Sequence, residues 1–403
     1  MKKVLIFSLT YYPKHVGGAE VAIKEITDRI PSSDIEFHAV VLGFDSTLPA
    51  VEKMGNVLVH RIGFSRPNPS MSDLRKFPLH YNKAIYQISA AFKAISLYRK
   101  YRYDAIWAMM AHSCATPAAL FKLFYPKVPY VLTLQEGDTP EYIERKMLPL
   151  WPLFKRGFTK ASIVQVISTF LGRWARRRNF TGPLEVIPNG VDTGKFAKNY
   201  PQADIDEIKT KLGKRMGDVF LITTSRLVHK NAVDDVIKAM SLIPRNVRFI
   251  VGGIGPDEEK LKKLALDTKV SDRVEFLGQL SHQDMPLYLK ASDIFIRPSR
   301  SEGMGNSFVE AMAAGLPVIA TQEGGIADFL FDRKRNPDKP TTGWAVSKDS
   351  PGEIAEGVKD IMDNPERTHA VAATAWALVM EKYGWDLIAN DMKEKVFDRL
   401  FKV

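Results

Sequence analysis

Arg226 and Lys230 stand four positions apart directly after the apolar run 220–224. The run predicts a buried strand, and open α/β sheets bind ligands beyond the carboxyl ends of their strands. Two fixed cations at that place suit a diphosphate, because they neutralise the negative charge of a leaving group. The alternative is a pair of solvated charges in a loop.

A longer segment, 298–318, runs from a predicted strand through a glycine-containing loop into an alanine-rich helix. Unpaired backbone N–H groups of Gly305, Asn306 and Ser307 at the start of that helix could cradle phosphate oxygens. Glu310, in the first turns of the helix, can accept hydrogen bonds from both hydroxyls of a ribose. The alternative makes Glu310 a helix-dipole residue and the alanines a close-packing surface.

A glycine pair, Gly17 and Gly18, follows the first apolar run and opens a helical pattern that contains Glu20. Glycines there let backbone N–H groups approach an anion closely at a helix N-terminus. The alternative is a plain strand-to-helix turn in which Glu20 complements the helix dipole.

Two series of short apolar runs alternate with helical patterns along the chain. The runs are continuous in Val, Ile and Leu, which predicts strands buried on both faces of parallel sheets with helical crossovers. The predicted strands are 4–8, 37–42, 57–61, 105–109, 130–134, 163–167 and 184–187, then 220–224, 247–251, 274–277, 294–296 and 318–320. We therefore expect an α/β protein of two Rossmann-like domains, 1–190 and 191–384.

The two domains are expected to join within 188–211, a stretch rich in Pro, Gly, Asn and Asp. The last stretch, 385–403, predicts an amphipathic helix. Such a helix needs a surface to cover, which the first domain could provide by packing against it.

The composition excludes several classes of protein. With 45% hydrophobic and 26% charged residues, 24 Pro and 26 Gly, the chain is not collagen-like, coiled-coil or disordered. A single cysteine, Cys114, excludes disulfides and cysteine-based metal sites and fits a reducing, cytoplasmic compartment. Neither a signal peptide nor a transmembrane helix is expected, because the apolar runs are short and lack a cleavage site.

The excess of positive over negative charge lies in the first half of the chain. Residues 1–190 hold 26 Lys and Arg against 14 Asp and Glu, while the rest is nearly neutral. Basic residues mixed with aromatic ones suit an anionic membrane surface, and solvated helix faces are the alternative. No nucleic-acid-binding motif is present. The basic residues concerned are Arg75, Lys76, Lys83, Lys93, Arg99, Lys100, Arg102, Lys155, Arg156, Lys160, Arg173, Arg176, Arg177 and Arg178.

Together these motifs resemble glycosyltransferase family 4 over about residues 1–385. The Gly-Gly-x-Glu turn, Ile-Pro-Asn-Gly-Val-Asp at 187–192, Arg-Leu-x-x-Lys-Asn at 226–231, and Glu302 followed by Glu310 occur in the family's order. The resemblance implies a GT-B fold, with two parallel sheets facing across a cleft. It also implies a retaining enzyme that uses a nucleotide-sugar.

The resemblance further implies roles for individual residues. Arg226 and Lys230 would bind the donor diphosphate, Glu310 the ribose, and Glu302 the hydroxyls of the transferred sugar. Gly17 and Gly18 would face the diphosphate, together with the turn of Gly305, Asn306 and Ser307. The backbone at Gly278 and Leu280 would hold the base, and His112 would approach the donor sugar, although it could also be an ordinary loop histidine. Gln135 and Glu136 stand where many relatives place a histidine, which concerns the acceptor contacts.

No metal and no cofactor are expected, because Asp234 and Asp235 lie in a helical pattern rather than in an Asp-x-Asp motif after a strand. The two cations and the helix ends would then stabilise the departing nucleotide. Since no residue is identified as a nucleophile, the sequence favours front-face attack through a short-lived oxocarbenium-like ion pair.

The sequence thus predicts a hexosyltransferase with a UDP- or GDP-sugar donor and a glycan, lipid-linked or phosphorylated acceptor. It is expected in the cytoplasm, with the inner membrane surface as a peripheral site. Two alternatives stay open: a nucleotide-sugar 2-epimerase of similar shape, and a donor-binding module without activity.

Overall fold

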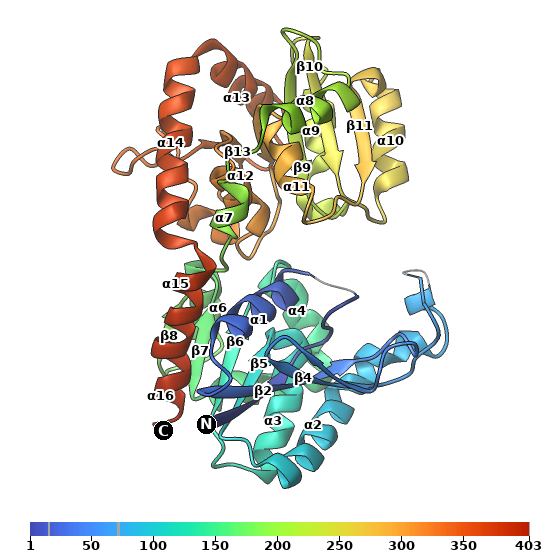
Figure 1. The fold of residues 1–403 in the computed structure, drawn as a ribbon, viewed down its shortest axis with the longest axis vertical. Coiled ribbons are helices and arrows are strands. Elements are labelled where there is room, and N and C mark those ends of the chain that lie inside the picture. Colours follow the sequence, from blue (N-terminus) through green and yellow to red (C-terminus); the bar gives the residue numbers. More distant parts are fainter. Residues whose placement is uncertain (15–16, 71–72, 403) are drawn as a thin grey trace. The chain divides into compact units, whose positions relative to one another are not determined.

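The computed structural model describes residues 1–14, 17–70 and 73–402. The chain divides into two compact units (Figure 1). The first unit comprises Met1–Asn189 and Trp385–Val403, and the second comprises Gly190–Gly384. None of the helices in these described ranges is long and apolar enough to cross a membrane.

The first unit contains an eight-stranded sheet in the order β3-β4-β2-β1-β5-β6-β7-β8. Neighbouring strands are parallel except β3 and β4, which are antiparallel. The strands are β1 (Lys2–Phe7), β2 (Ile35–Leu42), β3 (Val51–Met54), β4 (Val57–Ile62), β5 (Ala105–Met109), β6 (Tyr130–Leu134), β7 (Ile163–Val166) and β8 (Leu184–Val186).

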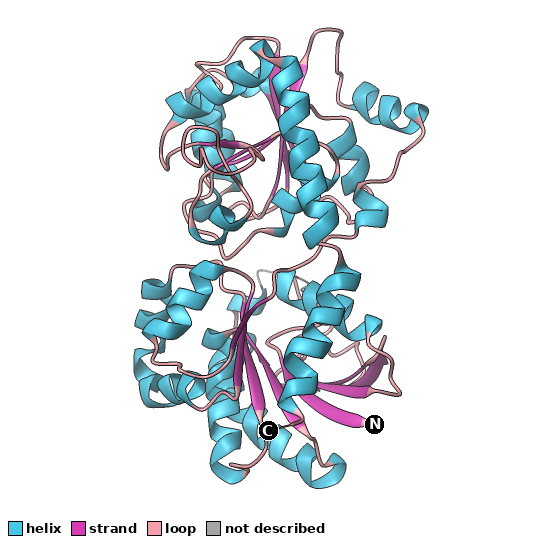
Figure 2. Ribbon diagram, turned by 90° about the vertical axis from the view of Figure 1, so that its left-hand side faces the viewer, coloured by secondary structure: helices cyan, strands magenta, loops and turns pink. Residues whose placement is uncertain are grey.

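Helices cover both faces of this sheet (Figure 2). They are α1 (Gly18–Arg29), α2 (Asn82–Tyr101), α3 (Thr116–Phe124), α4 (Pro140–Met147), α5 (Trp151–Thr159), α6 (Thr169–Arg177), α15 (Trp385–Asp391) and α16 (Asp398–Leu400). Short helical turns complete the unit: η1 (Asp73–Arg75), η2 (Leu79–Tyr81), η3 (Ala111–Ala115), η4 (Leu148–Leu150) and η8 (Met392–Phe397).

The C-terminal segment is part of the core of the first unit. Trp385, Ile388 and Phe397 are buried in one cluster with residues of α1 and of the central strands. The ring of Phe397 lies 5.3 Å from that of Trp107 and 5.7 Å from that of Phe37. The apolar face of the C-terminal helical segment therefore helps to cover the sheet of the first unit.

The second unit contains a six-stranded parallel sheet in the order β11-β10-β9-β12-β13-β14. Its strands are β9 (Val219–Thr224), β10 (Val247–Gly252), β11 (Val274–Gly278), β12 (Ile294–Arg297), β13 (Val318–Ala320) and β14 (Trp344–Ala345). Its helices and turns are α7 (Thr193–Phe196), α8 (Gln202–Lys211), η5 (His229–Asn231), α9 (Val233–Ala239), α10 (Glu258–Asp267), η6 (Ser271–Arg273), α11 (Met285–Lys290), α12 (Asn306–Ala313), η7 (Gly324–Asp328), α13 (Pro351–Asp363) and α14 (Pro365–Lys382).

Every strand predicted from the sequence is confirmed, with ends that differ by at most two residues. Two observed strands were not predicted. The edge strand β3 alternates between exposed and half-buried residues, so it has no continuous apolar run, and β14 is only two residues long. The boundary between the two units, Asn189 to Gly190, falls within the expected stretch 188–211, and the helices α7 and α8, which were not predicted, fold there as part of the second unit.

Candidate functional site

The strand order of each sheet places a topological switch point at its centre. In the second unit the chain runs from β9 outward through β10 and β11, then returns to the other side of β9 as β12. The chain connections after β9 and β12 therefore run in opposite directions along the sheet, and open α/β sheets bind ligands at such a switch point. These are the loops that carry Arg226 with Lys230 and Glu302 with Gly305.

Arg297, the last residue of β12, connects the two loops. It is 8% exposed, and its guanidinium donates to Asn231 Oδ1 (2.9 Å), Ser307 Oγ (2.8 Å) and the carboxylate of Glu302. Asn231 in turn donates to the carbonyl of Arg226 (2.6 Å). One buried cation thus fixes the loop of the predicted diphosphate cations against the loop of the predicted sugar-binding carboxylate. Sequence analysis missed Arg297, because a lone arginine at a strand end gives no pattern.

Glu302 is buried and its carboxylate is held on two sides. Besides its ion pair with Arg297, it accepts a hydrogen bond from the backbone N–H of Gly303 at 3.1 Å. Its backbone carbonyl accepts from Gly325 N at 3.1 Å, and Gly324 lies so close that a Cβ there would be 1.9 Å from the carbonyl oxygen. The glycine pair after β13 therefore positions Glu302, and sequence analysis did not single it out.

Glu310 lies on α12 and has an unusual environment. The residue is partly buried, and its carboxylate accepts no hydrogen bond from any residue in the described ranges. Burial raises the pKa of Glu310 to about 7, against the opposing attraction of Lys195 and Arg297. Gly305, at φ +85°, is the N-cap of this helix, so the helix begins directly after the loop that carries Glu302. A ligand hydroxyl would supply the donor that Glu310 lacks.

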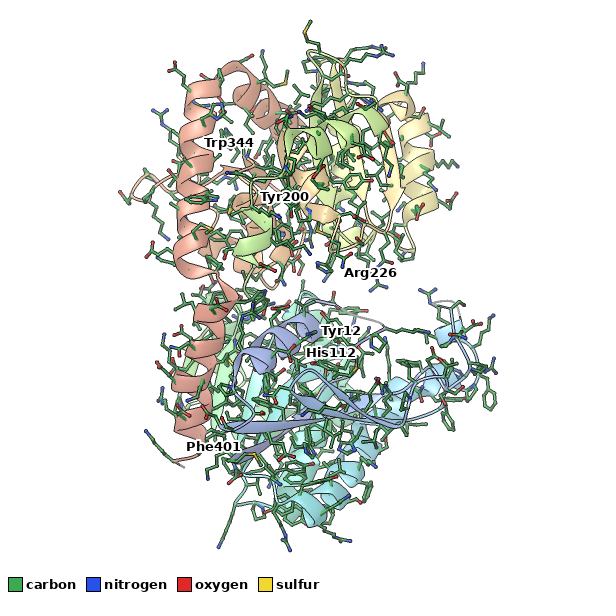
Figure 3. The ribbon with its side chains drawn as sticks, viewed as in Figure 1. Tyr12, His112, Tyr200, Arg226, Trp344 and Phe401 are labelled. Atoms are coloured by element: carbon green, nitrogen blue, oxygen red, sulfur yellow. The ribbon has the colours of Figure 1, made fainter. Side chains whose placement is uncertain are left out.

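The two predicted diphosphate cations lie on one turn. Arg226, labelled in Figure 3, is exposed, and no residue that the structure describes forms a hydrogen bond or ion pair with its side chain. The carbonyl of Lys230 accepts from Arg300 N at 2.7 Å, which joins this turn to the loop after β12. Among the described residues, the hydroxyls of Thr224, Ser225 and Ser299 are buried without a hydrogen-bond partner, as expected around a polar ligand site.

The glycine-rich stretch 252–255, at the end of β10, packs against the backbone of the turn that carries Arg226. A Cβ at Gly253 would lie 1.9 Å from the carbonyl oxygen of Ser225, and one at Gly255 would lie 2.1 Å from that of Leu227. The backbone of Ser225 also donates to Gly252 O at 2.9 Å. Only glycine permits such a close approach of two backbones. The sequence pattern Gly-Gly-x-Gly at the end of a predicted strand could have indicated it.

The predicted base-binding stretch follows the next strand, β11. Gly278 has φ +69° and its carbonyl accepts from Gly253 N at 2.7 Å, so this turn contacts the glycine loop. Leu280 lies over Gly252, where a Cβ would be 2.7 Å from its side chain. Both residues thus belong to the same group of strand-end loops as Arg226.

Asp234 and Asp235 lie in the first turn of α9, as predicted. Arg300 donates to Asp234 at 2.8 Å and to Asp235 at 2.7 Å, and Lys238 pairs with both carboxylates. Their negative charge is therefore balanced by cations of the chain itself. Within the described ranges no group of three His, Cys, Asp or Glu side chains is placed to hold a metal ion.

The first unit has its own switch point, between β1 and β5. Gly17 caps α1, and its N–H donates to the carboxylate of Glu20 at 2.8 Å, while Thr10 donates to the other carboxylate oxygen at 2.6 Å. Glu20 thus serves the helix N-terminus, as the simpler interpretation of this turn predicted. Gly17 and Gly18 are both exposed, and this leaves them accessible to an anion as well.

His112 follows β5 on the turn η3, at the same edge of the sheet as Tyr12 (Figure 3). Its Nδ1 lies 3.7 Å from the buried carboxylate of Glu136, which also accepts the backbone N–H of Ala111. Gln135, the residue before Glu136, pairs with Asn189 at 3.0 Å. In the stretch where many relatives place a histidine, this chain therefore has the carboxylate of Glu136, which faces His112.

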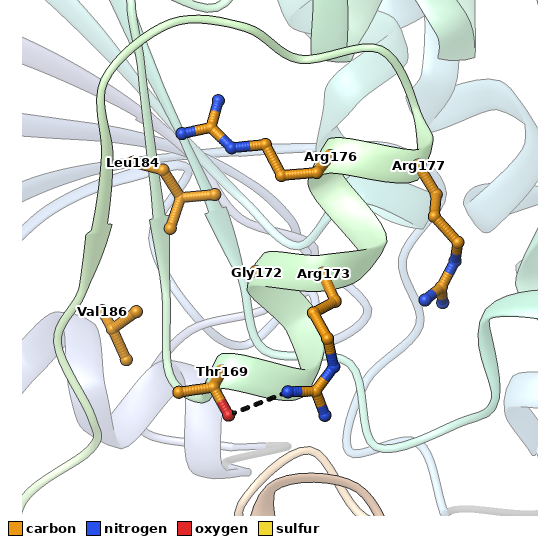
Figure 4. A pocket seen from close by; sticks show the side chains of 7 residues that line it. All are labelled: Thr169, Gly172, Arg173, Arg176, Arg177, Leu184 and Val186. Atoms are coloured by element: carbon orange, nitrogen blue, oxygen red, sulfur yellow. Dashed lines mark hydrogen bonds between the residues drawn. The ribbon is translucent and has the colours of Figure 1, made fainter.

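Three of the basic residues named from the sequence, Arg173, Arg176 and Arg177, lie on α6 and line a pocket of about 490 Å³ with Leu184 and Val186 of β8 (Figure 4). Arg176 donates to the carbonyls of Phe180 and Gly182, both at 2.9 Å, and so closes the following loop. Arg176 therefore has a structural role.

Two family models match the chain. Residues 16–195 match the family model described as Glycosyltransferase Family 4, and residues 204–376 match the model described as Glycosyl transferases group 1. Together the two matches cover most of the chain.

Two proteins similar in sequence to this chain have names that resemble each other. Over 58% of this chain and 61% of the relative, the sequence is 31% identical to the GDP-mannose-dependent monoacylated alpha-(1-6)-phosphatidylinositol monomannoside mannosyltransferase of Corynebacterium glutamicum. Over 57% of this chain and 60% of the relative, it is 34% identical to the GDP-mannose-dependent alpha-(1-6)-phosphatidylinositol monomannoside mannosyltransferase of Mycobacterium tuberculosis. The match therefore spans about three fifths of the length of these relatives.

Solved structures share the fold over the whole chain. The sucrose-phosphate synthase of Thermosynechococcus elongatus has a TM-score of 0.80 at 20% identity, with 100% of both chains covered. HepE of Anabaena in complex with UDP-glucose has a TM-score of 0.77 at 22% identity, with 99% of this chain and 100% of that chain covered.

Proposed function

Because the chain belongs to glycosyltransferase family 4 and has the GT-B fold, we propose that it transfers a hexose from a UDP- or GDP-sugar to a lipid-linked acceptor. The observation that carries the proposal is the buried network of Arg297, which joins the Arg226 turn to Glu302. The names of the mannosyltransferase relatives support a lipid acceptor, as does the name of the Streptococcus pneumoniae alpha-monoglucosyldiacylglycerol synthase, 26% identical over 82% of this chain and 74% of that one.

In the proposed complex the second unit holds the donor. Arg226, Lys230 and the N-terminus of α12 bind the diphosphate, and they oppose the charge that grows on it as the sugar leaves. Glu310 accepts hydrogen bonds from the ribose, and Glu302 accepts them from hydroxyls of the sugar. No metal ion and no cofactor take part, because these cations and the helix end supply the positive charge.

The chemistry we propose is front-face substitution with retention. The bond between the sugar's anomeric carbon and the phosphate oxygen breaks, and its electron pair goes to the phosphate. The acceptor hydroxyl attacks the same face, and its proton passes to that phosphate oxygen. The ion pair with Arg297 supports this route, since it compensates the charge that would make Glu302 a nucleophile.

The role of the first unit is to bring the acceptor to this donor. His112 and the exposed turn of Gly17 and Gly18 lie at its switch point, where ligands of such sheets bind. We place the reaction on the cytoplasmic side of a membrane, with the protein bound peripherally.

NMR of the product from an α-linked donor tests this mechanism. We expect an α-linked product, formed at an undiminished rate in excess chelator. A β-linked product, or a covalent sugar adduct on Glu302, would contradict front-face retention. Loss of activity in chelator would contradict metal independence.

A further inference from the structure

Helix α2 is apolar on both of its faces. One face is buried against the first unit through residues such as Tyr86, Ala90 and Ala94. A helix of this kind is normally covered on every side. Large apolar side chains nevertheless stand on the opposite, solvent-facing side of its N-terminal half.

These exposed side chains form a continuous row, which we call the apolar row. Tyr81, Ile85, Ile88 and Phe92 follow one another at intervals of four, three and four residues, so they lie along one side of the helix. Phe77 extends the row, with its ring 6.3 Å from that of Tyr81. The exposed fractions are 70% for Phe77, 49% for Tyr81, 39% for Ile85, 50% for Ile88 and 62% for Phe92.

Cations stand at both ends of the apolar row. Arg75 and Lys76 precede it and are exposed, and Arg99 and Lys100 follow it on the same helix and are also exposed. Residues 64–103 contain eight Lys or Arg and a single acidic residue, Asp73. The carboxylate of Asp73 is already hydrogen-bonded to Ser70 and Lys76. The surface around the row is therefore strongly positive.

The apolar row is also rigidly attached to the predicted acceptor site. On the buried face of α2, Gln87 donates to the carbonyl of His112 at 3.2 Å. Tyr86 donates to the carbonyls of Ser8 (2.7 Å) and Val40 (2.8 Å), at the carboxyl ends of β1 and β2. The row thus begins at the same edge of the sheet as His112.

From this combination we propose that the apolar row docks the protein on an anionic lipid bilayer. The five side chains enter the boundary between head groups and acyl chains, and the flanking cations contact lipid phosphates. The proposal rests on the proposed function, since a lipid-linked acceptor would then reach His112 without leaving the membrane. A second copy of the chain fits the row less well, because in either orientation a two-fold contact would bring its cationic ends together.

The test measures sedimentation with vesicles of phosphatidylcholine and phosphatidylglycerol, and with vesicles of phosphatidylcholine alone. We expect the wild-type protein to sediment with the anionic vesicles. The triple variant Ile85→Gln, Ile88→Gln, Phe92→Gln should lose about a hundredfold in vesicle affinity, since roughly half of each side chain is exposed and can be inserted. This loss should persist at high salt.

A charge variant and a matched control complete the design. Arg75→Gln with Arg99→Gln should lose about thirtyfold in affinity at low salt and much less at high salt. The control, Leu242→Gln with Leu266→Gln, removes two side chains of the second unit that are each 64% exposed, and it should bind vesicles like the wild type. Unchanged melting temperatures would show that all variants are folded.

Several results would overturn the proposal. They are wild-type protein that stays in the supernatant, a triple variant that sediments like the wild type, and a wild-type dimer that the triple variant dissociates. Nucleotide binding, measured on the same proteins, separates this proposal from the proposed function. Vesicle binding without any nucleotide binding would refute the transferase and leave the docking surface intact.

Discussion

The environment of Glu310 leads to a prediction that can be worked out in full. Burial without a hydrogen-bond partner raises its pKa from 4.5 to about 7. Below pH 4.5 the carboxyl is protonated in both the folded and the unfolded chain, so folding is unaffected. Between pH 4.5 and 7 the unfolded chain ionises first, and stability is progressively lost as the pH rises. Above pH 7 the loss is complete, at most about 3 kcal/mol.

The substitution Glu310→Gln keeps the shape of the side chain and removes this ionisation. At pH 8 the ligand-free variant should therefore melt several degrees above the wild type, and at pH 4.5 the two should melt together. Differential scanning calorimetry measures both. Glu366→Gln, an exposed glutamate in the first turn of α14, is the control and should change neither value.

Nucleotide binding should show the opposite dependence. If a ribose donates to the ionised carboxylate, binding requires loss of the proton, so affinity rises with pH through 7. With a pKa of about 7 in the free protein, the wild type should bind its nucleoside diphosphate about tenfold more tightly at pH 8 than at pH 6. Glu310→Gln should bind weakly at both. An identical pH profile in the variant would refute the assigned role of Glu310.

Two further substitutions test the framework of the site. Arg297→Met leaves a buried carboxylate without its partner, so urea unfolding should show a loss of about 3–5 kcal/mol in unfolding free energy; an unchanged midpoint would speak against the buried ion pair. Gly324→Ala places a Cβ 1.9 Å from the carbonyl oxygen of Glu302 at φ +62°, and it should unfold at clearly lower urea concentration than Gly352→Ala, whose Cβ meets nothing within 4 Å. Equal midpoints for the two glycine variants would contradict the close approach.

Most of the parallel strands were predictable because they are buried on both faces and therefore consist of continuous apolar runs. The strands β8 and β11 are only partly buried. The edge strand β3 was not predictable, since half of it is solvated and its spelling, Val-Glu-Lys-Met, is that of a surface loop. The helices α7 and α8 were missed for a related reason. They lie within a stretch rich in Pro and Gly, and α8 has no fully buried residue that would mark an apolar face.

The candidate site divides in a similar way. Its cations and carboxylates were identifiable because their types and spacing suit a diphosphate and a ribose, and because the family motifs repeat them. The residues that position them were not. Arg297 contacts partners 66 and 10 positions away, and no local pattern records such distant contacts. Gly253 and Gly324 act through backbone approaches that only the folded chain displays.

For the exposed side of α2, the sequence showed the residues but not which of them are exposed. Its mixture of basic and aromatic residues was visible in the sequence, with solvated charges as the alternative. Which aromatic and aliphatic side chains remain uncovered depends on how the helix packs. Tyr86 is fully buried whereas Phe92 is 62% exposed, although both are aromatic residues of one helix.

The central claim is that the turn of Arg226 and Lys230 belongs to a nucleotide-sugar site, and thermal unfolding with UDP, GDP and ADP tests it most directly. One of these nucleotides should raise the melting temperature of the wild-type protein by several degrees. The shift should disappear in the double variant Arg226→Gln, Lys230→Gln. A shift of equal size in the double variant, or no shift with any nucleoside diphosphate, would contradict the claim.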